Sequence, residues 1–251
     1  MPDGSSSHWV AGGERHLIAH RGASLFAPEN SPEAVRQAAA RGATDVEVDV
    51  NMTADGVLLA VHDGVVAGGG VRWISQMTEA EVRSAAAAAS APDPARLDDV
   101  LAVVAEAGLG VYLDVKQLLP GGSARLGDLV RAHGLGDRAV GASFRADLAG
   151  RLKTEGGLTT SLLFHDPGID VHSLARGLDL DFVHPCYDVF GDGALGPFTP
   201  EWVAAVRAVG FGIVAWNTLD VAVAAEIFAR GADAVCSDDP AVLVEAVASL
   251  T

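Results

Sequence analysis

The stretch HLIAHRGASLFAPENSPEAVRQAAARGATDVEVDVNM (16–52) decides the fold. Two short apolar runs of strand type, 16–22 and 45–52, enclose a helical run at 32–42 that opens on Pro32. Proline suits the first position of a helix because its fixed φ is helical and its missing N–H has no helical partner there. A strand–helix–strand unit of this kind favours two parallel strands joined by a helical crossover.

The alternation of extended and helical runs continues to the end of the chain. Thr199 and Asp220 are suited to cap two of the later helices. Further extended runs lie at 111–116, 139–144, 159–164, 180–185, 212–217 and 233–238. Eight strand–helix units in 251 residues predict an α/β fold, a single-domain (β/α)8 TIM barrel, with an open doubly wound sheet as the alternative.

The units also predict where the barrel begins and where it departs from regular alternation. We expect the barrel to occupy 16–251, after an N-terminal extension at 1–15. The run 58–63 is expected to form an extra strand that pairs with the end of 45–52. The stretch 64–95 is the one part that we expect to be irregular.

Composition narrows the class of protein. Hydrophobic residues make up 49% of the chain and charged residues 20%, which allows a sizeable core and argues against global disorder. The net charge of −16 repels nucleic acid phosphates, so no nucleic acid partner is expected. The sequence has neither a signal-peptide pattern nor an apolar run of about 18 residues, so no stable membrane insertion is expected. The two cysteines are far apart and suit a reducing compartment, so we expect a cytoplasmic enzyme.

The run 45–52 carries the first sign of chemistry. Because side chains alternate along a strand, Asp45, Glu47 and Asp49 share one face and the intervening valines share the other. If the valines pack on helices, the carboxylates point into the barrel, where an unpaired charge is costly. A divalent cation such as Mg²⁺, Ca²⁺ or Mn²⁺ would balance them. The alternative is a half-buried strand with a solvated acidic face.

Reactive side chains also stand at the ends of other extended runs, where TIM barrels carry their catalytic residues. His20 and Arg21 end the first run, and His62 ends the run at 58–63. Histidine suits proton transfer near neutral pH, and arginine can contact two phosphate oxygens at once. Asp114 and Lys116 share a face of 111–116, as a further metal ligand and a phosphate-binding cation or as a plain ion pair.

These pieces together form a compound motif: HRG (20–22), PENS (28–31), EVDV (47–50), TADG (53–56) and HD (62–63). In order and spacing the motif resembles the signature of the glycerophosphodiester phosphodiesterase family. Weaker similarity continues through Asp114-Val115-Lys116, Ser143-Phe144, Trp216 and Ser237-Asp238-Asp239-Pro240. The likeness therefore runs through nearly the whole chain.

The resemblance implies a barrel enzyme that hydrolyses small-molecule glycerophosphodiesters to an alcohol and sn-glycerol 3-phosphate. It implies these site residues: His20 and His62 as general acid and base, Arg21, Lys116 and Trp216 as substrate contacts, and Glu47, Asp49 and Asp114 as ligands of one divalent cation. The chain departs from the family at Asp114, where glutamate is usual, and at Asn217, which follows the tryptophan. The oligomeric state is not predicted.

Other functions on the same barrel remain open. A phospholipase D-like enzyme acting on lysophospholipids would need an apolar rim, to which Phe26, Trp73, Phe190 and Phe198 could contribute. A non-catalytic barrel that binds a phosphorylated ligand, or a sugar-phosphate isomerase, would not need this set of histidines and acids. His184, before Pro185 at a strand end, is a weaker candidate for approaching the site.

Overall fold

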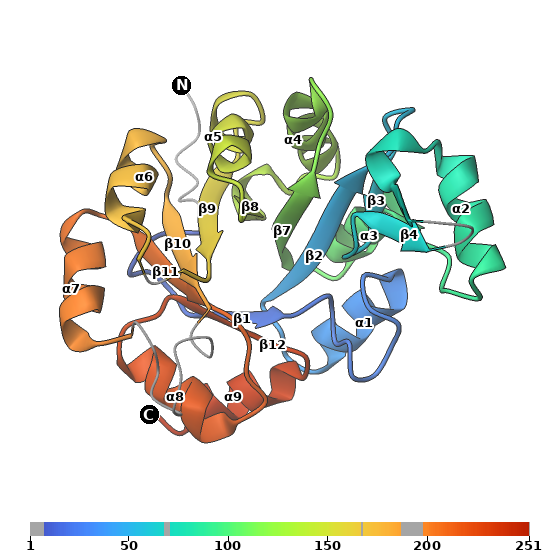
Figure 1. Cartoon of the computed structure of the whole chain (residues 1–251). Coiled ribbons are helices and arrows are strands. Elements are labelled where there is room, and N and C mark those ends of the chain that lie inside the picture. The colour runs from blue at the N-terminus through green and yellow to red at the C-terminus, as the bar shows by residue number, and fades with distance from the viewer. Residues whose placement is uncertain (1–7, 68–70, 167, 187–197, 251) are drawn as a thin grey trace.

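The protein is a closed β/α barrel. The computed structural model describes residues 8–67, 71–166, 168–186 and 198–250. Among them, eight parallel strands form a ring in which β1 pairs with both β12 and β2 (Figure 1). In the order of the ring the strands are β1 (His16–Ala19), β12 (Ala234–Ser237), β11 (Gly212–Ala215), β10 (Phe182–Pro185), β9 (Thr159–Phe164), β8 (Ala139–Ser143), β7 (Gly110–Gln117) and β2 (Asp45–Met52). The predicted TIM barrel is confirmed, and the closed ring excludes the open sheet.

Helices cover the outside of the ring (Figure 1). Thr199 and Asp220 cap α7 and α8 as predicted, because their side-chain oxygens accept N–H groups of the first helical turn. None of the helices formed by the described residues has the length and apolar character needed to span a bilayer. The helices are α1 (Pro32–Ala40), α3 (Leu97–Glu106), α4 (Gly122–Ala132), α5 (Ala146–Thr154), α6 (Val171–Gly177), α7 (Pro200–Ala208), α8 (Val221–Ala229) and α9 (Pro240–Ala248).

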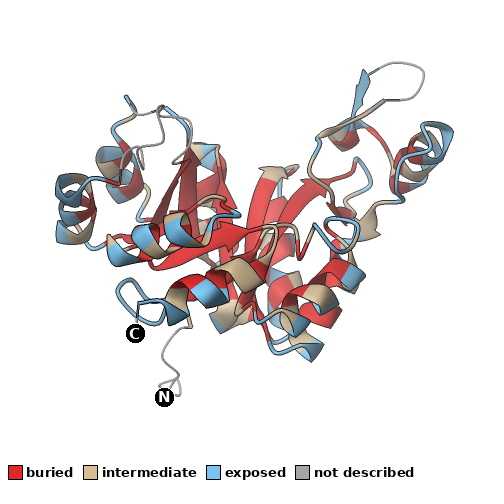
Figure 2. Ribbon diagram, turned by 90° about the horizontal axis from the view of Figure 1, so that it is seen from below, coloured by how far each residue is buried: buried red, intermediate tan, exposed pale blue. Residues whose placement is uncertain are grey.

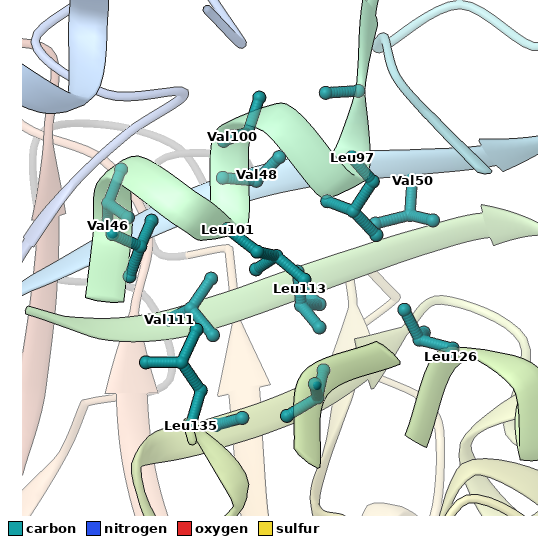
Figure 3. Close-up of a cluster of buried hydrophobic side chains, with 14 of the residues drawn as sticks. Val46, Val48, Val50, Leu97, Val100, Leu101, Val111, Leu113, Leu126 and Leu135 are labelled. Atoms are coloured by element: carbon teal, nitrogen blue, oxygen red, sulfur yellow. The ribbon is translucent and has the colours of Figure 1, made fainter. Parts of the chain in front are cut away.

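The hydrophobic core lies between the strands and the helices. Val46, Val48 and Val50 of β2 are fully buried and meet Leu97 and Leu101 of α3, as Figure 3 shows. Figure 2 shows the same division, with buried strands inside and exposed outer faces on the helices. The opposite face of β2 therefore points into the barrel, which places its carboxylates there as expected.

The stretch after β2 is more regular than predicted. β3 (Leu58–Ala60) pairs antiparallel with the end of β2, which confirms the extra strand. The expectation that 64–95 is irregular is wrong. It holds the hairpin β4 (Val65–Ala67) and β5 (Val71–Trp73), the turn η1 (Ile74–Gln76), helix α2 (Glu79–Ala88) and the start of β6 (Ala95–Arg96).

Local features of the sequence explain this order. The side chains of Thr78 and Glu81 cap each other's backbone N–H groups at the start of α2. Leu59, Ile74 and Val82 form a small core of their own, separate from the barrel core. The segment from β3 to β6 projects from one side of the barrel (Figure 1).

The segment before β1 packs against the barrel. Trp9 is 3% exposed, and its ring stacks on that of His16 at 3.8 Å between centroids. It also meets Phe182 edge to face. Residues 8–15 thus reach the end of the barrel at which the strands begin, although the domain boundary at 16 stays a prediction.

Close backbone contact between α4 and the loop after α5 predicts a strong effect of one added methyl group. A Cβ at Gly127 would lie 2.0 Å from the backbone oxygen of Gly156, which has no flexible side chain to move aside. We expect Gly127→Ala to lower the free energy of unfolding by about 1–3 kcal/mol, measured by urea denaturation. Gly177→Ala is the control, because nothing lies within 4 Å of a Cβ there. Equal stability of the two variants would contradict the packing.

Candidate active site

The predicted site residues lie at the carboxyl ends of the barrel strands: most lie in or directly after β1, β2 and β7, Trp216 directly follows β11, and His62 follows β3. His20 and Arg21 directly follow β1, and the strand register places Asp49 of β2 beside Asp114 of β7. Among the predicted residues, all but Asp49 and His62 line one narrow cavity. Its lining is His20, Arg21, Glu47, Tyr112, Asp114, Lys116, Leu163, His184, Trp216 and Cys236.

Three buried carboxylates form an oxygen-rich cluster beside this cavity: Glu47 and Asp114 line it, and Asp49 lies next to Asp114. One oxygen each of Glu47, Asp49 and Asp114 lies within 4.8 Å of the other two. Burial raises the pKa of Glu47 well above its usual range, and the carboxylates of Asp49 and Asp114 raise it further. Asp114 Oδ1 is buried without a hydrogen-bond partner. A crowded set of oxygen donors with an unpartnered buried oxygen fits a hard divalent cation.

Two basic side chains offset part of the negative charge of the carboxylate cluster. Lys116 Nζ lies 2.9 Å from Asp49 Oδ1 and also contacts the Asp114 carboxylate. Arg21 Nε lies 3.2 Å from Asp49 Oδ2. Burial alone would raise the pKa of Asp49, but Lys116, the amide of Asn30 and Arg21 outweigh it and lower that pKa. Asp114 and Lys116 thus form the ion pair considered above, within the site.

The loop after β1 is held against the carboxylates by the backbone of Arg21 and the side chain of Asn30. Arg21 has a φ of 52°, and its N–H donates to Glu47 Oε2 at 2.7 Å. Asn30 has a φ of 56°. Its side-chain Nδ2 donates to Asp49 Oδ2 at 2.8 Å, and its side-chain Oδ1 accepts the backbone N–H of Asp49 at 2.9 Å. Left-handed conformations at residues other than glycine are strained, and such strain is concentrated at functional sites. Asn30 therefore supports the carboxylate.

His20 is oriented by an acid from the far end of the chain. Its Nδ1 lies 2.7 Å from Asp238 Oδ1, and its Nε2 lies 3.9 Å from Glu47 Oε2. Asp238 also accepts the Ser24 hydroxyl at 2.7 Å and the Asn217 amide at 3.2 Å. Burial would raise the pKa of Asp238, but these hydrogen bonds and His20 lower it to about 2. An ionised carboxylate on Nδ1 leaves Nε2 directed at the cavity.

Asp238 is a site residue that the sequence marks only by its position. The acid directly follows β12, at the same end of the barrel as the other site residues. It also belongs to the weaker similarity to the family at 237–240, which implies no role for it. Asn217, where the chain departs from the family pattern, contacts the same carboxylate and lies 3.3 Å from His20 Nδ1.

Removing the charge of Asp238 tests whether this acid positions His20. We expect Asp238→Asn to lower kcat by about 10-fold to 100-fold, the loss expected for a hydrogen bond to a charged group. Because the pKa of Asp238 is about 2, its carboxylate stays ionised throughout an assay range of roughly pH 5–9. The negative charge that the substitution removes is therefore present across this whole range, and steady-state kinetics of the wild type and the variant measure the loss. An unchanged kcat would show that Asp238 does not position His20.

His62 lies at the rim of the site and not in the cavity lining. It follows β3, and the N–H of the preceding Val61 donates to the carbonyl oxygen of Asp49 at 3.2 Å. Its side chain is 39% exposed, and its Nδ1 lies 2.9 Å from Asp63 Oδ1. Burial raises the pKa of Asp114, whereas Lys116 and, more weakly, His62 lower it. The His62 imidazole is thus close enough to the carboxylate cluster to act on its charge.

Aromatic and imidazole rings complete the cavity. His184 is buried, its Nδ1 lies 2.8 Å from the Tyr112 hydroxyl, and its Nε2 has no hydrogen-bond partner. Burial lowers the pKa of His184 to about 3, and the positive charges of His20 and Lys116 act in the same direction. A neutral imidazole with an unpartnered nitrogen therefore faces the cavity. The Trp216 ring lies 6.4 Å from the rings of both His20 and His184.

Solved structures share the architecture. A glycerophosphodiester phosphodiesterase from Agrobacterium tumefaciens superposes with a TM-score of 0.70 at 24% identity, over 91% of this chain and 98% of that one. A phosphodiesterase from Oleispira antarctica, solved in complex with the product sn-glycerol-3-phosphate, superposes with a TM-score of 0.74 at 22% identity, over 92% and 96% of the two chains. At these identities the likeness establishes the fold.

Sequence comparison establishes the family. The glycerophosphodiester phosphodiesterase of Caldanaerobacter subterraneus subsp. tengcongensis is 25% identical over 243 residues, which cover 92% of this chain and 97% of that relative. Glycerophosphodiester phosphodiesterase 1 of Rattus norvegicus is 57% identical over 49 residues, a segment that spans 20% of this chain and 15% of that relative. The profile of the glycerophosphoryl diester phosphodiesterase family matches residues 20–242. The chain belongs to the glycerophosphoryl diester phosphodiesterase family.

Proposed function

We propose that this protein hydrolyses glycerophosphodiesters to an alcohol and sn-glycerol 3-phosphate with the help of one divalent cation. The observation that carries the proposal is the three-carboxylate cluster beside a cavity that His20, Arg21 and Lys116 also line. Membership of the family supports it, as does the product held by the Oleispira antarctica relative. A purely ligand-binding barrel would not need a histidine held by a partly buried acid beside a cluster of metal-ligand type.

Glu47, Asp49 and Asp114 are the residues that would hold the cation. The ligand atoms are oxygens, which suit Mg²⁺, Ca²⁺ or Mn²⁺. When bound, such an ion draws electrons from the phosphoryl oxygens and offsets the negative charge that repels a nucleophile. Asp114 is one methylene shorter than the usual glutamate, yet its carboxylate comes within the same 4.8 Å as the other two.

Arg21 and Lys116 supply the remaining positive charge. Both reach the carboxylate cluster, and the overall charge of −16 makes such a local patch necessary for an anionic substrate. Their N–H groups can donate to the equatorial phosphoryl oxygens and stabilise the charge that builds up there in the transition state.

His20 and His62 are proposed as the pair that moves protons. In each imidazole Nδ1 is engaged by a carboxylate, Asp238 for His20 and Asp63 for His62. In both cases Nε2 is the nitrogen left to exchange a proton with substrate. One imidazole takes the proton of the attacking hydroxyl and the other protonates the departing alkoxide.

The glycerol and the leaving alcohol are proposed to lie on opposite sides of Lys116. On the cavity side, His184 Nε2 can hydrogen-bond a glycerol hydroxyl, and the ring of Trp216 forms a wall. On the other side lies an open groove of about 390 Å³, lined by Trp73, Ser75, Gln76, Lys116, Gln117 and Arg145. No carboxylate belongs to the described lining of this groove, which favours uncharged or anionic head groups over cationic ones.

Changing the charge at Arg145 tests this placement of the head group. We expect Arg145→Gln to raise kcat/KM for glycerophosphocholine relative to glycerophosphoglycerol by about 2-fold to 5-fold, the range of an exposed charge interaction. Steady-state kinetics with both substrates measure the ratio. Arg151→Gln, an exposed arginine of α5 that pairs with Glu155, is the control and should leave the ratio unchanged. A ratio that does not move in Arg145→Gln would place the head group elsewhere.

The phospholipase D-like alternative finds less support. Phe198 is fully buried in the core behind the strands, and Phe26 is 45% exposed with the Arg41 guanidinium 3.2 Å from its ring centroid. Trp73 does line the groove, and Phe190 lies outside the described residues. The described aromatic residues do not assemble into a rim for a lipid tail.

A coupled assay for glycerol 3-phosphate tests the proposal directly. Glycerophosphocholine, glycerophosphoethanolamine and a lysophospholipid should be offered with Mg²⁺, Ca²⁺ or Mn²⁺. We expect glycerol 3-phosphate from the first two. Cleavage of the lysophospholipid would leave lysophosphatidate, so its turnover is followed by release of the head-group alcohol and should be small. Cleavage of the lysophospholipid alone would favour the alternative, and no product from any of them would overturn the proposal. The cytoplasmic location and the absence of a nucleic acid partner stay predictions from the sequence.

A further inference from the structure

A second cluster of ligand-type side chains lies at the opposite end of the barrel. Asp45 and His16 are the first residues of β2 and β1, whereas the active site stands at the other ends of these strands. His8 Nε2 lies 3.0 Å from Asp45 Oδ1, and His16 Nδ1 lies 2.8 Å from Asp45 Oδ2. Of the three acids expected on one face of β2, Asp45 thus belongs to a separate group with two histidines.

The cluster is enclosed but reachable. Asp45 and His16 are buried, whereas the side chain of His8 is 31% exposed and opens the group to solvent. The stacked ring of Trp9 holds His16 in place. A Cβ at Gly110 would lie 1.9 Å from Asp45 Oδ1 and 3.0 Å from His8 Nε2, so only glycine leaves room for these atoms at the start of β7.

We propose that His8, His16 and Asp45 bind a transition-metal ion of the Zn²⁺ type. One ligand atom from each residue lies within 4.8 Å of the others, the arrangement that a three-ligand site requires. Two imidazole nitrogens and one carboxylate oxygen suit Zn²⁺, Co²⁺ or Ni²⁺ and disfavour Mg²⁺ and Ca²⁺, which prefer oxygen. The partly exposed His8 leaves the three-residue group accessible from solvent. The hydroxyl of Thr44 donates to Asp45 Oδ2 at 2.7 Å and orients the carboxylate.

The ion would connect three separate parts of the fold. His8 precedes the barrel, His16 opens β1 and Asp45 opens β2. Because only the folded chain brings these residues together, binding stabilises the folded state. We expect Tm to rise by about 5–10 °C at a free Zn²⁺ concentration of roughly 100 times Kd. This role is structural and does not depend on the proposed hydrolysis.

Zinc binding to the chelator-treated full chain tests the proposal. Zn²⁺ should be titrated by calorimetry in excess Mg²⁺, which occupies the carboxylate cluster, for the wild type, Glu47→Gln and His8→Ala. We expect one equivalent of Zn²⁺ in the first two and a loss of at least about 10-fold in affinity in His8→Ala. Because His8 is partly exposed, this variant should fold. Co²⁺ should add visible absorption bands that His8→Ala lacks.

His133→Ala is the matched control. His133 Nε2 lies 2.7 Å from Asp98 Oδ1 on the outer surface, where this histidine–carboxylate pair belongs to no metal-type cluster among the described residues. Its loss should leave Zn²⁺ uptake unchanged. Uptake that survives His8→Ala or disappears in Glu47→Gln would assign the ion to another site. No uptake by the wild type would mean that the cluster is held by hydrogen bonds alone, and either result overturns the proposal.

Discussion

Alanine at His20 is expected to lower kcat by about 10²-fold to 10⁴-fold, the contribution of one general acid or base. The imidazole is held by Asp238 on Nδ1 and faces the Glu47 carboxylate with Nε2 at 3.9 Å. Alanine removes the group proposed to exchange a proton with the substrate and leaves the carboxylate cluster in place. Initial rates of glycerol 3-phosphate release, with Tm as a check on folding, measure the effect.

His62→Ala should lower kcat by a similar factor. Comparing the two variants on a second substrate shows which histidine is the general acid and which is the general base. A substrate with p-nitrophenol as the leaving alcohol needs no proton from the enzyme, because its alkoxide is already stable. The variant that lacks the general acid should regain much of its rate on this substrate, whereas the variant that lacks the base should not. Near-normal rates in either variant on glycerophosphocholine would remove that histidine from the mechanism. His133→Ala again serves as the surface control.

Loss of the cation or of one of its carboxylates is expected to be equally severe. Chelation with EDTA should abolish turnover, and Mg²⁺ or Mn²⁺ should restore it. A bound cation contributes several kcal/mol of transition-state stabilisation, so Asp114→Asn should lower kcat/KM by about 10²-fold to 10⁴-fold. The substitution keeps the size of the side chain and removes the charge from the unpartnered Oδ1 position. Kinetics at several cation concentrations and calorimetric titration with Mn²⁺ measure both effects.

Asp114→Glu tests whether the length of this side chain sets the choice of cation. Glutamate is the residue usual in the family, so it should keep activity while changing which cation supports the highest rate. Asp128→Asn is the control, since this exposed aspartate of α4 pairs with Arg131 and belongs to neither the cavity nor the groove. Full activity of the EDTA-treated wild type, with metal absent by elemental analysis, would remove the cation from the proposal.

Local sequence patterns predict most of the barrel strands and several of the residues at the candidate site. The alternation in β2 is a property of any strand, so Val46, Val48 and Val50 had to oppose Glu47 and Asp49. The strand ends at His20 and Lys116 were likewise visible, because parallel strands in a barrel bring their carboxyl ends to one side. Local patterns do not predict the strands and helix inside 64–95, because their small core combines residues from both sides of the β4–β5 pair.

The sequence by itself determined the repeating strand–helix units, the buried acidic face of β2 and the motif that marks the family, since each depends on neighbours along the chain. Only the tertiary structure decided which partners those residues have. Closing the ring brings β12 next to β1, and with it Asp238 to His20, although 218 positions separate them. Strand length sends Asp45 to one end of the barrel and Asp49 to the other, although both lie on the same face. Such contacts depend on register and closure, which no local pattern encodes.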